Sequence, residues 1–151
     1  MRPLAIPSAL FTLLTLGCAR RDARELLDQI REDDYRGWTR APGWEAPRSP
    51  ARGGPHGKFI DIYVNDVLAD ATEESQLAAW PDGALIVKDG WNDDAGNDLQ
   101  YIVVMEKRGD DWFWAEYDDD DKVKYAGTAI RTCTSCHERG DDYVLAFKLP
   151  R

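Results

Sequence analysis

Alternating hydrophobic and polar positions in the middle of the chain predict a β-sheet. The hydrophobic side chains of Ile60, Ile62 and Val64 alternate with Asp and Tyr, which is the two-residue period of a strand. Further strands are predicted at residues 84–89 (ALIVKD), 100–108 (QYIVVMEKR), 112–117 (WFWAEY) and 143–149 (YVLAFKL). Most of the regular structure is therefore expected to be β.

Turn sequences between these runs predict antiparallel pairing. Residues 109–111 (GDD) separate two strands and predict a hairpin loop. Residues 81–83 (PDG) predict a turn, because Pro presets φ and Gly permits a positive φ. Residues 91–99 (WNDDAGNDL) predict a polar turn region. Consecutive strands joined by turns imply an α+β fold, mainly an antiparallel β-sheet with a few flanking helices.

Helical periodicity is clearest before the sheet. Leu26, Leu27 and Ile30 fall at helical spacing, and Asp22 is suited to cap the start, so we expect a helix over residues 22–34.

The next segment, residues 36–55, carries four of the eight prolines and is expected to hold no regular element. Trp38 and Trp44 are expected to pack it against the core. A short helix is predicted over residues 73–79.

Composition limits the class of protein. The chain has 151 residues, of which 43% are hydrophobic, and this suits one globular domain with a modest core. The net charge of −9 argues against nucleic acid as a partner, because no basic face is available to neutralise phosphates. No internal repeat and no second domain is evident.

Residues 133–137 (CTSCH) form a C-x-x-C-H motif, the attachment signature of a c-type haem. Cys133 and Cys136 can each form a thioether to the porphyrin edge, and His137 can then bind the iron. A zinc ribbon would need a second C-x-x-C or paired histidines, which the sequence lacks. A disulfide between the two cysteines would close a very small loop and gain little. We therefore expect a covalently attached haem c, with the motif beginning a short helix.

The N-terminus resembles an export signal. Residues 1–17 combine a basic start with a short apolar run, too short to span a membrane. Cys18 is expected to be the lipid-bearing first residue of a mature lipoprotein, although Thr15 stands where a lipobox usually has Leu. The alternative is an ordinary secretory signal with an incidental cysteine. Residues 18–34 would then form a tether and helix, and residues 35–151 the haem domain of a periplasmic or extracytoplasmic protein.

Several segments, taken in order, resemble the cytochrome P-460 family, which includes the related cytochromes c-prime-beta. The matching pieces are residues 35–38 (YRGW), His56-Gly57 with the following strand to Asn65, residues 80–89 (WPDGALIVKD), residues 112–117, and CTSCH followed by Asp142-Tyr143-Val144. The resemblance covers about residues 35–149. The order of the pieces, with P-D-G-x-x-x-V-K ahead of a C-terminal haem motif, makes it specific.

The resemblance implies a periplasmic, mostly β haem c domain that often forms a homodimer. His137 would be the proximal ligand, with a distal pocket open to small nitrogen species. In the catalytic branch a lysine in the place of Lys88 is cross-linked to the haem, and hydroxylamine is oxidised. In the other branch the haem binds nitric oxide or related gases.

Four residues have more than one interpretation. Lys88 could contact the haem, or its ammonium could reach solvent from the strand end. Glu116 is the best candidate for the acid that handles protons during hydroxylamine oxidation, but strand alternation could equally turn it to solvent. His56 could be a sixth iron ligand or a polar pocket group, and a hydrogen-bonded loop residue is the simpler reading. Met105 could ligate the iron, although a core or pocket wall position is simpler.

Three functions remain open from the sequence. The first is a haem enzyme, an oxidoreductase acting on hydroxylamine or a similar compound and passing electrons to a partner protein. The second is a non-catalytic cytochrome that binds nitric oxide or another gas. The third is an electron carrier with a six-coordinate iron.

Overall fold

The computed structural model describes residues 22–151. The expected signal segment and Cys18 lie outside the described residues. Within residues 22–151, no helix has both the length and the apolar character needed to cross a bilayer.

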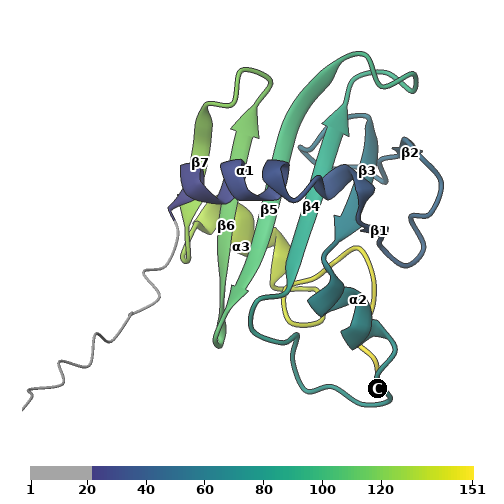
Figure 1. Ribbon diagram of the computed structural model, residues 1–151, viewed down its shortest axis with the longest axis vertical. Coiled ribbons are helices and arrows are strands. Elements are labelled where there is room, and N and C mark those ends of the chain that lie inside the picture. The colour runs from purple at the N-terminus through teal and green to yellow at the C-terminus, as the bar shows by residue number, and fades with distance from the viewer. Residues whose placement is uncertain (1–21) are drawn as a thin grey trace, which may run out of the picture.

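The described residues form a seven-stranded antiparallel sheet with helices on both faces (Figure 1). The strand order is β1-β3-β4-β5-β6-β7, and β2 pairs with β3 beside β1. The strands are β1 (Thr39–Arg40), β2 (Ser49–Pro50), β3 (Phe59–Val64), β4 (Leu85–Trp91), β5 (Leu99–Arg108), β6 (Asp111–Asp118) and β7 (Val123–Gly127). The helices are α1 (Ala23–Glu32), the 3-10 helix η1 (Tyr35–Gly37), α2 (Asp66–Thr72) and α3 (Arg131–His137). The expected α+β class is confirmed.

Helix α1 crosses one face of the sheet (Figure 1). A capping box fixes its start, because the Asp22 carboxylate accepts from the backbone of Arg24 and Glu25, and the Glu25 side chain returns to the Asp22 backbone. Leu26 and Ile30 are fully buried on this face. The helix predicted over residues 22–34 is confirmed and ends at Glu32.

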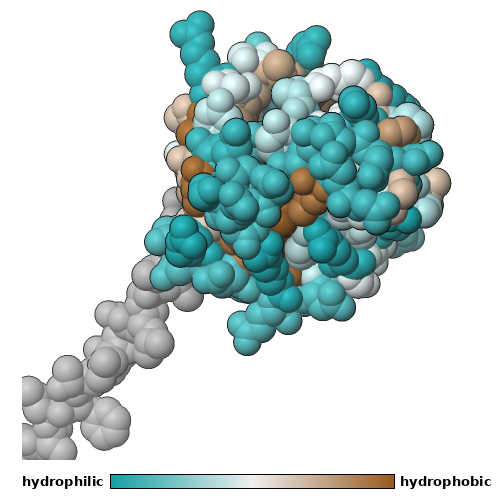
Figure 2. All heavy atoms as spheres, turned by 90° about the horizontal axis from the view of Figure 1, so that it is seen from above, coloured by the Kyte–Doolittle hydropathy of each residue, from teal (hydrophilic) through white to brown (hydrophobic). Residues whose placement is uncertain are grey.

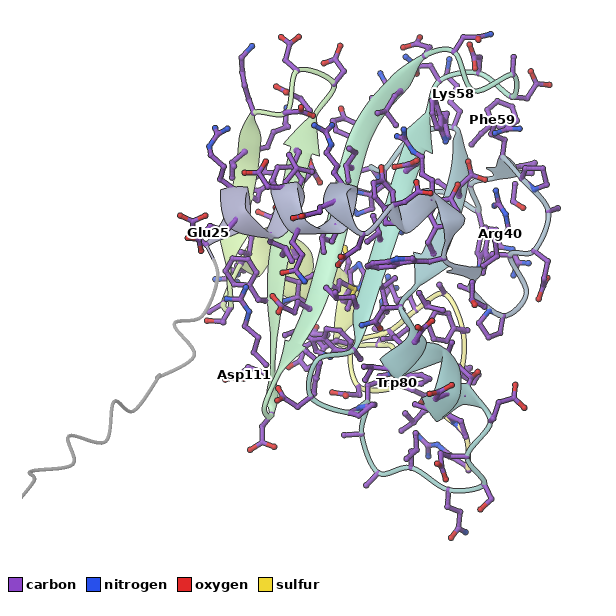
Figure 3. All side chains as sticks on the ribbon, viewed as in Figure 1. Glu25, Arg40, Lys58, Phe59, Trp80 and Asp111 are labelled. Atoms are coloured by element: carbon purple, nitrogen blue, oxygen red, sulfur yellow. The ribbon has the colours of Figure 1, made fainter. Side chains whose placement is uncertain are left out.

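The opposite face of the sheet packs against α2, α3 and the C-terminal segment. Figure 1 shows α3 behind the sheet, on the side away from α1. Trp80 lies beside α2 (Figure 3), and its ring meets Phe147 edge to face at 5.4 Å between centroids. The sheet therefore has two separate apolar layers, and only the layer opposite α1 adjoins the C-x-x-C-H helix.

The central strands agree with the predictions. The strand at residues 60–64 is confirmed as β3, and β4 begins one residue later than predicted and runs two residues further, to Trp91. Strands β5 and β6 pair as a hairpin, with Arg108 opposite Asp111. The turn before β4 is closed by a hydrogen bond from Ala84 N to Pro81 O of 3.1 Å.

The helix predicted over residues 73–79 is wrong. The helix lies earlier, at Asp66–Thr72, because the Asn65 side chain caps it by accepting from Leu68 N, and Leu68 and Ala71 face the core. Leu77 instead donates its backbone N–H to Pro150 O in a loop contact.

The strand predicted over residues 143–149 is also wrong. Tyr143 has a positive φ of 64°, and only an isolated bridge joins Asp141 to Val144. Val144, Phe147 and Leu149 are buried through tertiary packing, without a ladder partner. The strand that the prediction missed, β7, has mainly exposed residues, so no apolar face marks it in the sequence.

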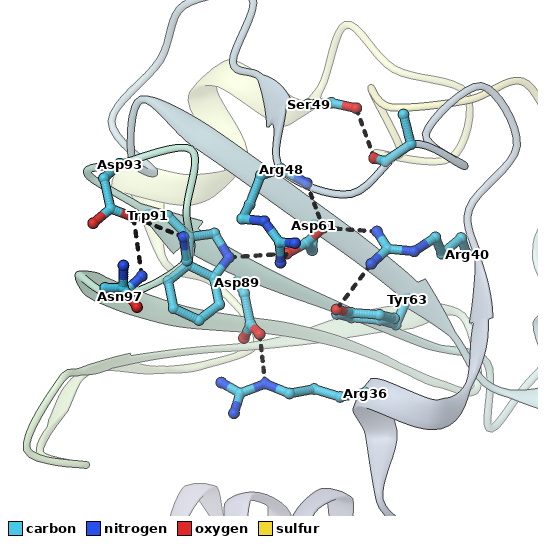
Figure 4. Close-up of polar contacts among 12 residues, drawn as sticks. Arg36, Arg40, Arg48, Ser49, Asp61, Tyr63, Asp89, Trp91, Asp93 and Asn97 are labelled. Atoms are coloured by element: carbon cyan, nitrogen blue, oxygen red, sulfur yellow. Dashed lines mark hydrogen bonds and ion pairs between the residues drawn. The ribbon is translucent and has the colours of Figure 1, made fainter.

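The proline-rich segment is more ordered than expected, since residues 36–55 contain β1 and β2 and part of η1. Buried carboxylates attach this segment to the sheet (Figure 4). Asp61 accepts from Arg40 Nη1 at 2.7 Å, from Arg48 N at 2.8 Å and from Trp91 Nε1 at 3.0 Å.

Asp89, which lies opposite Asp61 on β4, accepts from Tyr35 Oη at 2.8 Å and from Arg36 Nε at 2.7 Å. Trp44 is buried and donates to Ala146 O, so it anchors the segment as predicted.

The end of the molecule that carries the turns at residues 92–98 and 119–122 is mostly hydrophilic (Figure 2). Side chains within the acidic turn bond to its own backbone, as Asp118 Oδ1 accepts from the N–H groups of Asp120 and Lys122. Asp121 pairs with Arg31 of α1.

Candidate functional site

One row of side chains on the sheet face opposite α1 lies next to the motif histidine. Pairing of β4, β5 and β6 puts Ile86, Met105 and Trp114 side by side across the sheet. The Trp114 and His137 rings meet edge to face, with centroids 4.8 Å apart. We call these three strand residues the histidine row.

A second row lies two residues further along the same strands. The pairing puts Lys88, Val103 and Glu116 side by side. Two residues of strand correspond to about 6.6 Å, and positions i and i+2 share one face. We call these residues the polar row. Strand alternation therefore puts the Glu116 side chain on the Lys88 face and does not turn it to solvent, and the side chain is only 12% exposed.

A cavity opens between these rows and α3. It contains about 340 Å³ of empty space including its mouth. Its lining consists of His56, Ile86, Lys88, Val103, Met105, Trp114, Cys133 and His137. The cavity therefore brings together residues from the loop before β3, from three strands and from the C-x-x-C-H helix. Met105 lines the wall of this cavity, as the simpler interpretation of the sequence predicted.

Helix α3 contains the motif, and the predicted helix begins two residues earlier than expected, at Arg131. Residues three and four apart share one side of a helix, so Cys133, Cys136 and His137 are displayed together. Cys133 is half-buried at the cavity, Cys136 is exposed, and both thiols are free. Burial raises the pKa of the Cys133 thiol, and the negative charge of Glu116 adds to this effect.

His137 is prepared to bind a metal through one nitrogen. Its Nδ1 lies 2.9 Å from Tyr143 O, and since a carbonyl can only accept, Nδ1 carries the proton and Nε2 is left as the lone-pair donor. Burial lowers the pKa of His137 to about 4, helped by the positive charges of Lys88 and His56 and opposed by the Tyr143 hydrogen bond. The imidazole is therefore neutral at pH 7, as a ligand must be.

Lys88 lies in the cavity wall and is partly buried. Burial lowers its pKa to about 8. No hydrogen bond or ion pair to its ammonium is found within residues 22–151. The structure favours a cavity position over a solvent-facing one, and a lysine with this pKa is neutral often enough to react as an amine.

His56 lies in the cavity wall, so it is a polar pocket group, one of the alternatives that the sequence left open. Among the described residues, its buried Nδ1 has no hydrogen-bond partner. The same atom is 3.3 Å from Glu116 Oε2, close enough to pair after a small rotation. Glu116 does not line the cavity itself, but it reaches His56, which does.

A glycine on β4 positions His56. A Cβ at position 90 would collide with the His56 carbonyl oxygen, so only glycine lets this loop lie against the strand. No local pattern in the sequence reveals this contact, so the cavity position of His56 could not be predicted from it.

The donors present suit a covalently bound haem. The Cys133 thiol and a neutral imidazole with an available Nε2 line a cavity with a largely apolar wall, and the second free thiol, Cys136, is exposed on the same helix. No group of three or more His, Cys, Asp or Glu side chains between residues 22 and 151 is arranged to hold a bare metal ion. This combination of sheet, helix and donors defines a c-type cytochrome that is built on β-structure.

A family model described as Cytochrome P460 matches residues 32–146, and the chain belongs to this family. Family membership implies a haem c cytochrome, so the resemblance noted from the sequence is confirmed. A search of curated proteins found no match.

Proposed function

We propose that this cytochrome carries one haem c on Cys133 and Cys136, with His137 as the axial ligand, and that it oxidises hydroxylamine or a similar small nitrogen compound. The observation that carries the proposal is the gathering of Lys88, His56 and Glu116 one row away from the row that contacts His137. Polar groups able to hold and deprotonate a ligand thus lie at or beside the cavity that His137 also lines.

The iron would supply the redox centre for this chemistry. His56 would hydrogen-bond a small ligand through its Nε2, because the side chain lines the cavity while its Nδ1 faces Glu116 Oε2 at 3.3 Å. Glu116 would accept, through His56, protons that an amine or hydroxylamine loses on oxidation. The electrons would leave to a partner protein. Ile86, Val103 and Trp114 would exclude water from the cavity wall.

Lys88 would hold the porphyrin by a third covalent bond. Such a bond replaces one N–H of Lys88 Nζ and one C–H of the porphyrin by an N–C bond, and it releases two protons and two electrons to an external oxidant such as dioxygen. Its lowered pKa of about 8 supports this role, because the reacting amine must be neutral.

Mass spectrometry of the haem-bearing peptides tests this assignment. A cross-link predicts that a haem peptide from a digest contains both the CTSCH segment and the segment with Lys88, two hydrogens lighter than the sum of its unlinked parts. The Lys88→Met variant should keep both thioethers and lose the third link, with loss of hydroxylamine oxidation measured with an artificial electron acceptor. A wild-type haem peptide with only two links would sink the catalytic assignment.

A gas-binding cytochrome is the second candidate. It is favoured by the apolar part of the wall, which shields a small uncharged ligand from water. This function predicts a change in the ferrous spectrum with carbon monoxide or nitric oxide, without any hydroxylamine turnover. No spectral change with either gas excludes it.

An electron carrier is the third candidate, since Met105 and His56 both line the cavity and either could be a sixth ligand. It predicts a low-spin optical spectrum in both redox states. A high-spin resting spectrum rules it out.

We further propose that the protein is exported, is lipid-anchored at Cys18 and forms a homodimer. The support is the signal-like sequence of residues 1–17 and the family resemblance. Membrane fractionation of the wild type and of Cys18→Ser tests the anchor, and a wild type found wholly in the soluble fraction contradicts it. Light scattering of the purified haem domain tests the dimer.

A further inference from the structure

Two consecutive residues after the motif helix adopt left-handed backbone conformations. Asp142 has φ 46° and Tyr143 has φ 64°. Neither is glycine, and a bulky aromatic residue seldom occupies this region. Such a conformation persists only where surrounding contacts over-determine it.

The contacts on Asp142 provide this support. Its two carboxylate oxygens each lie 2.9 Å from Lys107 Nζ, and Oδ2 also accepts from Trp80 N at 2.9 Å. Its carbonyl oxygen accepts from Trp112 Nε1 at 2.8 Å. Lys107 is only 2% exposed on β5, so the ion pair ties the segment after α3 to the sheet from inside the molecule.

A glycine closes the other end of the same loop. A Cβ at position 140 would collide with the Val144 carbonyl oxygen, while Val144 N donates to Asp141 O at 3.0 Å. The loop from residue 138 to residue 144 is therefore fixed at the sheet by Asp142 and is closed on itself at Gly140.

This loop presents one group to the motif. The Tyr143 carbonyl accepts from His137 Nδ1, and the Tyr143 ring meets Trp114 edge to face at 6.4 Å. The strength and direction of a hydrogen bond to an axial histidine set the orientation and basicity of that ligand.

We propose that the buried Lys107–Asp142 ion pair is a positioning device for His137: it holds the Asp142–Tyr143 turn so that the Tyr143 carbonyl fixes the orientation and electron donation of the axial imidazole. This inference rests on the proposed function only in taking His137 as the axial ligand. Neither residue touches the cavity, so they act through the backbone of Tyr143.

Asp142→Asn in the haem-loaded protein is the main test. Asn tolerates the left-handed region as well as Asp does, so the change removes the charge and keeps the turn accessible. We expect the iron–histidine stretching band of the ferrous protein, measured by resonance Raman, to shift to lower frequency, and the haem reduction potential to rise, because a weaker hydrogen bond leaves the imidazole a poorer donor. Lys107→Met should shift both readings in the same direction, and the double variant should shift them no further than one of the single variants.

Asp141→Asn is the matched control. Asp141 is the preceding residue, and among residues 22–151 its carboxylate pairs only with the exposed side chains of Lys148 and Arg151. It should leave the band and the potential unchanged. If Asp142→Asn fails to fold, Lys107→Met provides the same readings.

The outcomes separate this inference from the proposed function. If the wild type shows an iron–histidine stretching band and neither Asp142→Asn nor Lys107→Met shifts it, the inference is overturned and the proposed function is unaffected. A wild-type five-coordinate ferrous protein without any iron–histidine band overturns the axial assignment of His137, and the inference with it.

Discussion

Single residues at the cavity owe their chemistry more to burial than to charged partners. Lys88 has a pKa of about 8 because burial disfavours its charge and no carboxylate pairs with it among the described residues. His137 is neutral for the same main reason. Burial of an ammonium without a charged partner lowers the free energy of unfolding, so Lys88 destabilises the fold.

Lys88→Met should stabilise the haem-free protein at pH 7. The folded pKa lies below the ordinary value, so the unfolded chain binds the extra proton, and the penalty of burying Lys88 is complete below pH 8 and disappears as the pH rises toward about 10.4. The gain should be on the order of 3 kcal/mol at pH 7 and should shrink across that window, measured by urea unfolding.

Lys58→Met is the control for this prediction, because Lys58 is exposed just before β3. It should show no such pH dependence. A gain for Lys88→Met that is constant from pH 7 to pH 10.5 would show that the ammonium is not the cause.

Glu116 should affect the thiol chemistry of the haem-free protein. Burial and then the Glu116 charge raise the pKa of Cys133, so Glu116→Gln should increase the rate of Cys133 alkylation at pH 8 by roughly twofold or more. The assay uses a Cys18→Ser, Cys136→Ser background so that only the Cys133 thiol is alkylated. Glu138→Gln, directly after α3, should leave the rate unchanged, and equal rates in the two variants would contradict the effect of the Glu116 charge on Cys133.

Single side chains also join whole elements, and Asn65 joins three. Its Oδ1 accepts from Leu68 N at the start of α2 and from Leu85 N at the start of β4, while Nδ2 donates to Gly83 O. The end of β3, the helix and the next strand therefore share one amide group.

Asn65→Ala should lower the free energy of unfolding by about 2 kcal/mol, since a helix cap and two further buried hydrogen bonds are lost. Asn97→Ala, in the exposed turn between β4 and β5, should change it by less than about 0.5 kcal/mol. Chemical denaturation of both variants measures the difference, and similar values for the two would contradict the role of Asn65.

Elements that carry their own periodic pattern could be predicted from the sequence, and those fixed by distant contacts could not. The hairpin of β5 and β6 was predictable because two apolar strands flank a Gly-Asp loop. Residues 143–149 have the composition of a strand, but the ion pair on Asp142 turns their start into a left-handed loop. The helix predicted over residues 73–79 lies earlier because the Asn65 cap starts it at Asp66, and it ends at Thr72.

The candidate site was predictable where one motif carries it. Cys133, Cys136 and His137 follow from spacing in the sequence alone. The placement of Glu116 on the Lys88 face needed the register of β6, and the cavity position of His56 needed its contact with Gly90, which no local pattern reveals.

At the scale of the whole molecule, two buried carboxylates on β3 and β4 link stability to pH in opposite directions. Burial pushes the pKa of Asp61 up, but hydrogen bonds from Arg48 and Arg40 outweigh it and hold the pKa below its usual range. For Asp89 burial prevails over the Arg36 hydrogen bond, and its pKa is raised. Ionised Asp61 therefore stabilises the fold at pH values above the ordinary aspartate pKa of about 4. The contribution of Asp89 to the free energy of unfolding becomes less favourable as the pH rises above that value.

Asp61→Asn should destabilise the protein by about 3 kcal/mol at neutral pH, because Arg40 loses its buried partner. The loss should diminish as the pH falls from about 4 toward the lowered folded pKa of Asp61, because the unfolded chain takes up a proton in this window before the folded carboxylate does. Asp89→Asn should have the opposite slope, gaining stability relative to the wild type as the pH rises above about 4. Thermal unfolding from pH 3 to pH 7 compares them, and parallel slopes would contradict the assignment.

The position of the haem motif after the sheet also determines the order in which the parts of the site are synthesised. Strands β3 to β6, which supply the cavity wall, all precede α3 in the chain. During synthesis the strands that supply the wall are therefore made before Cys133 and Cys136, which attach the cofactor. Haem capture in this protein would complete folding rather than start it.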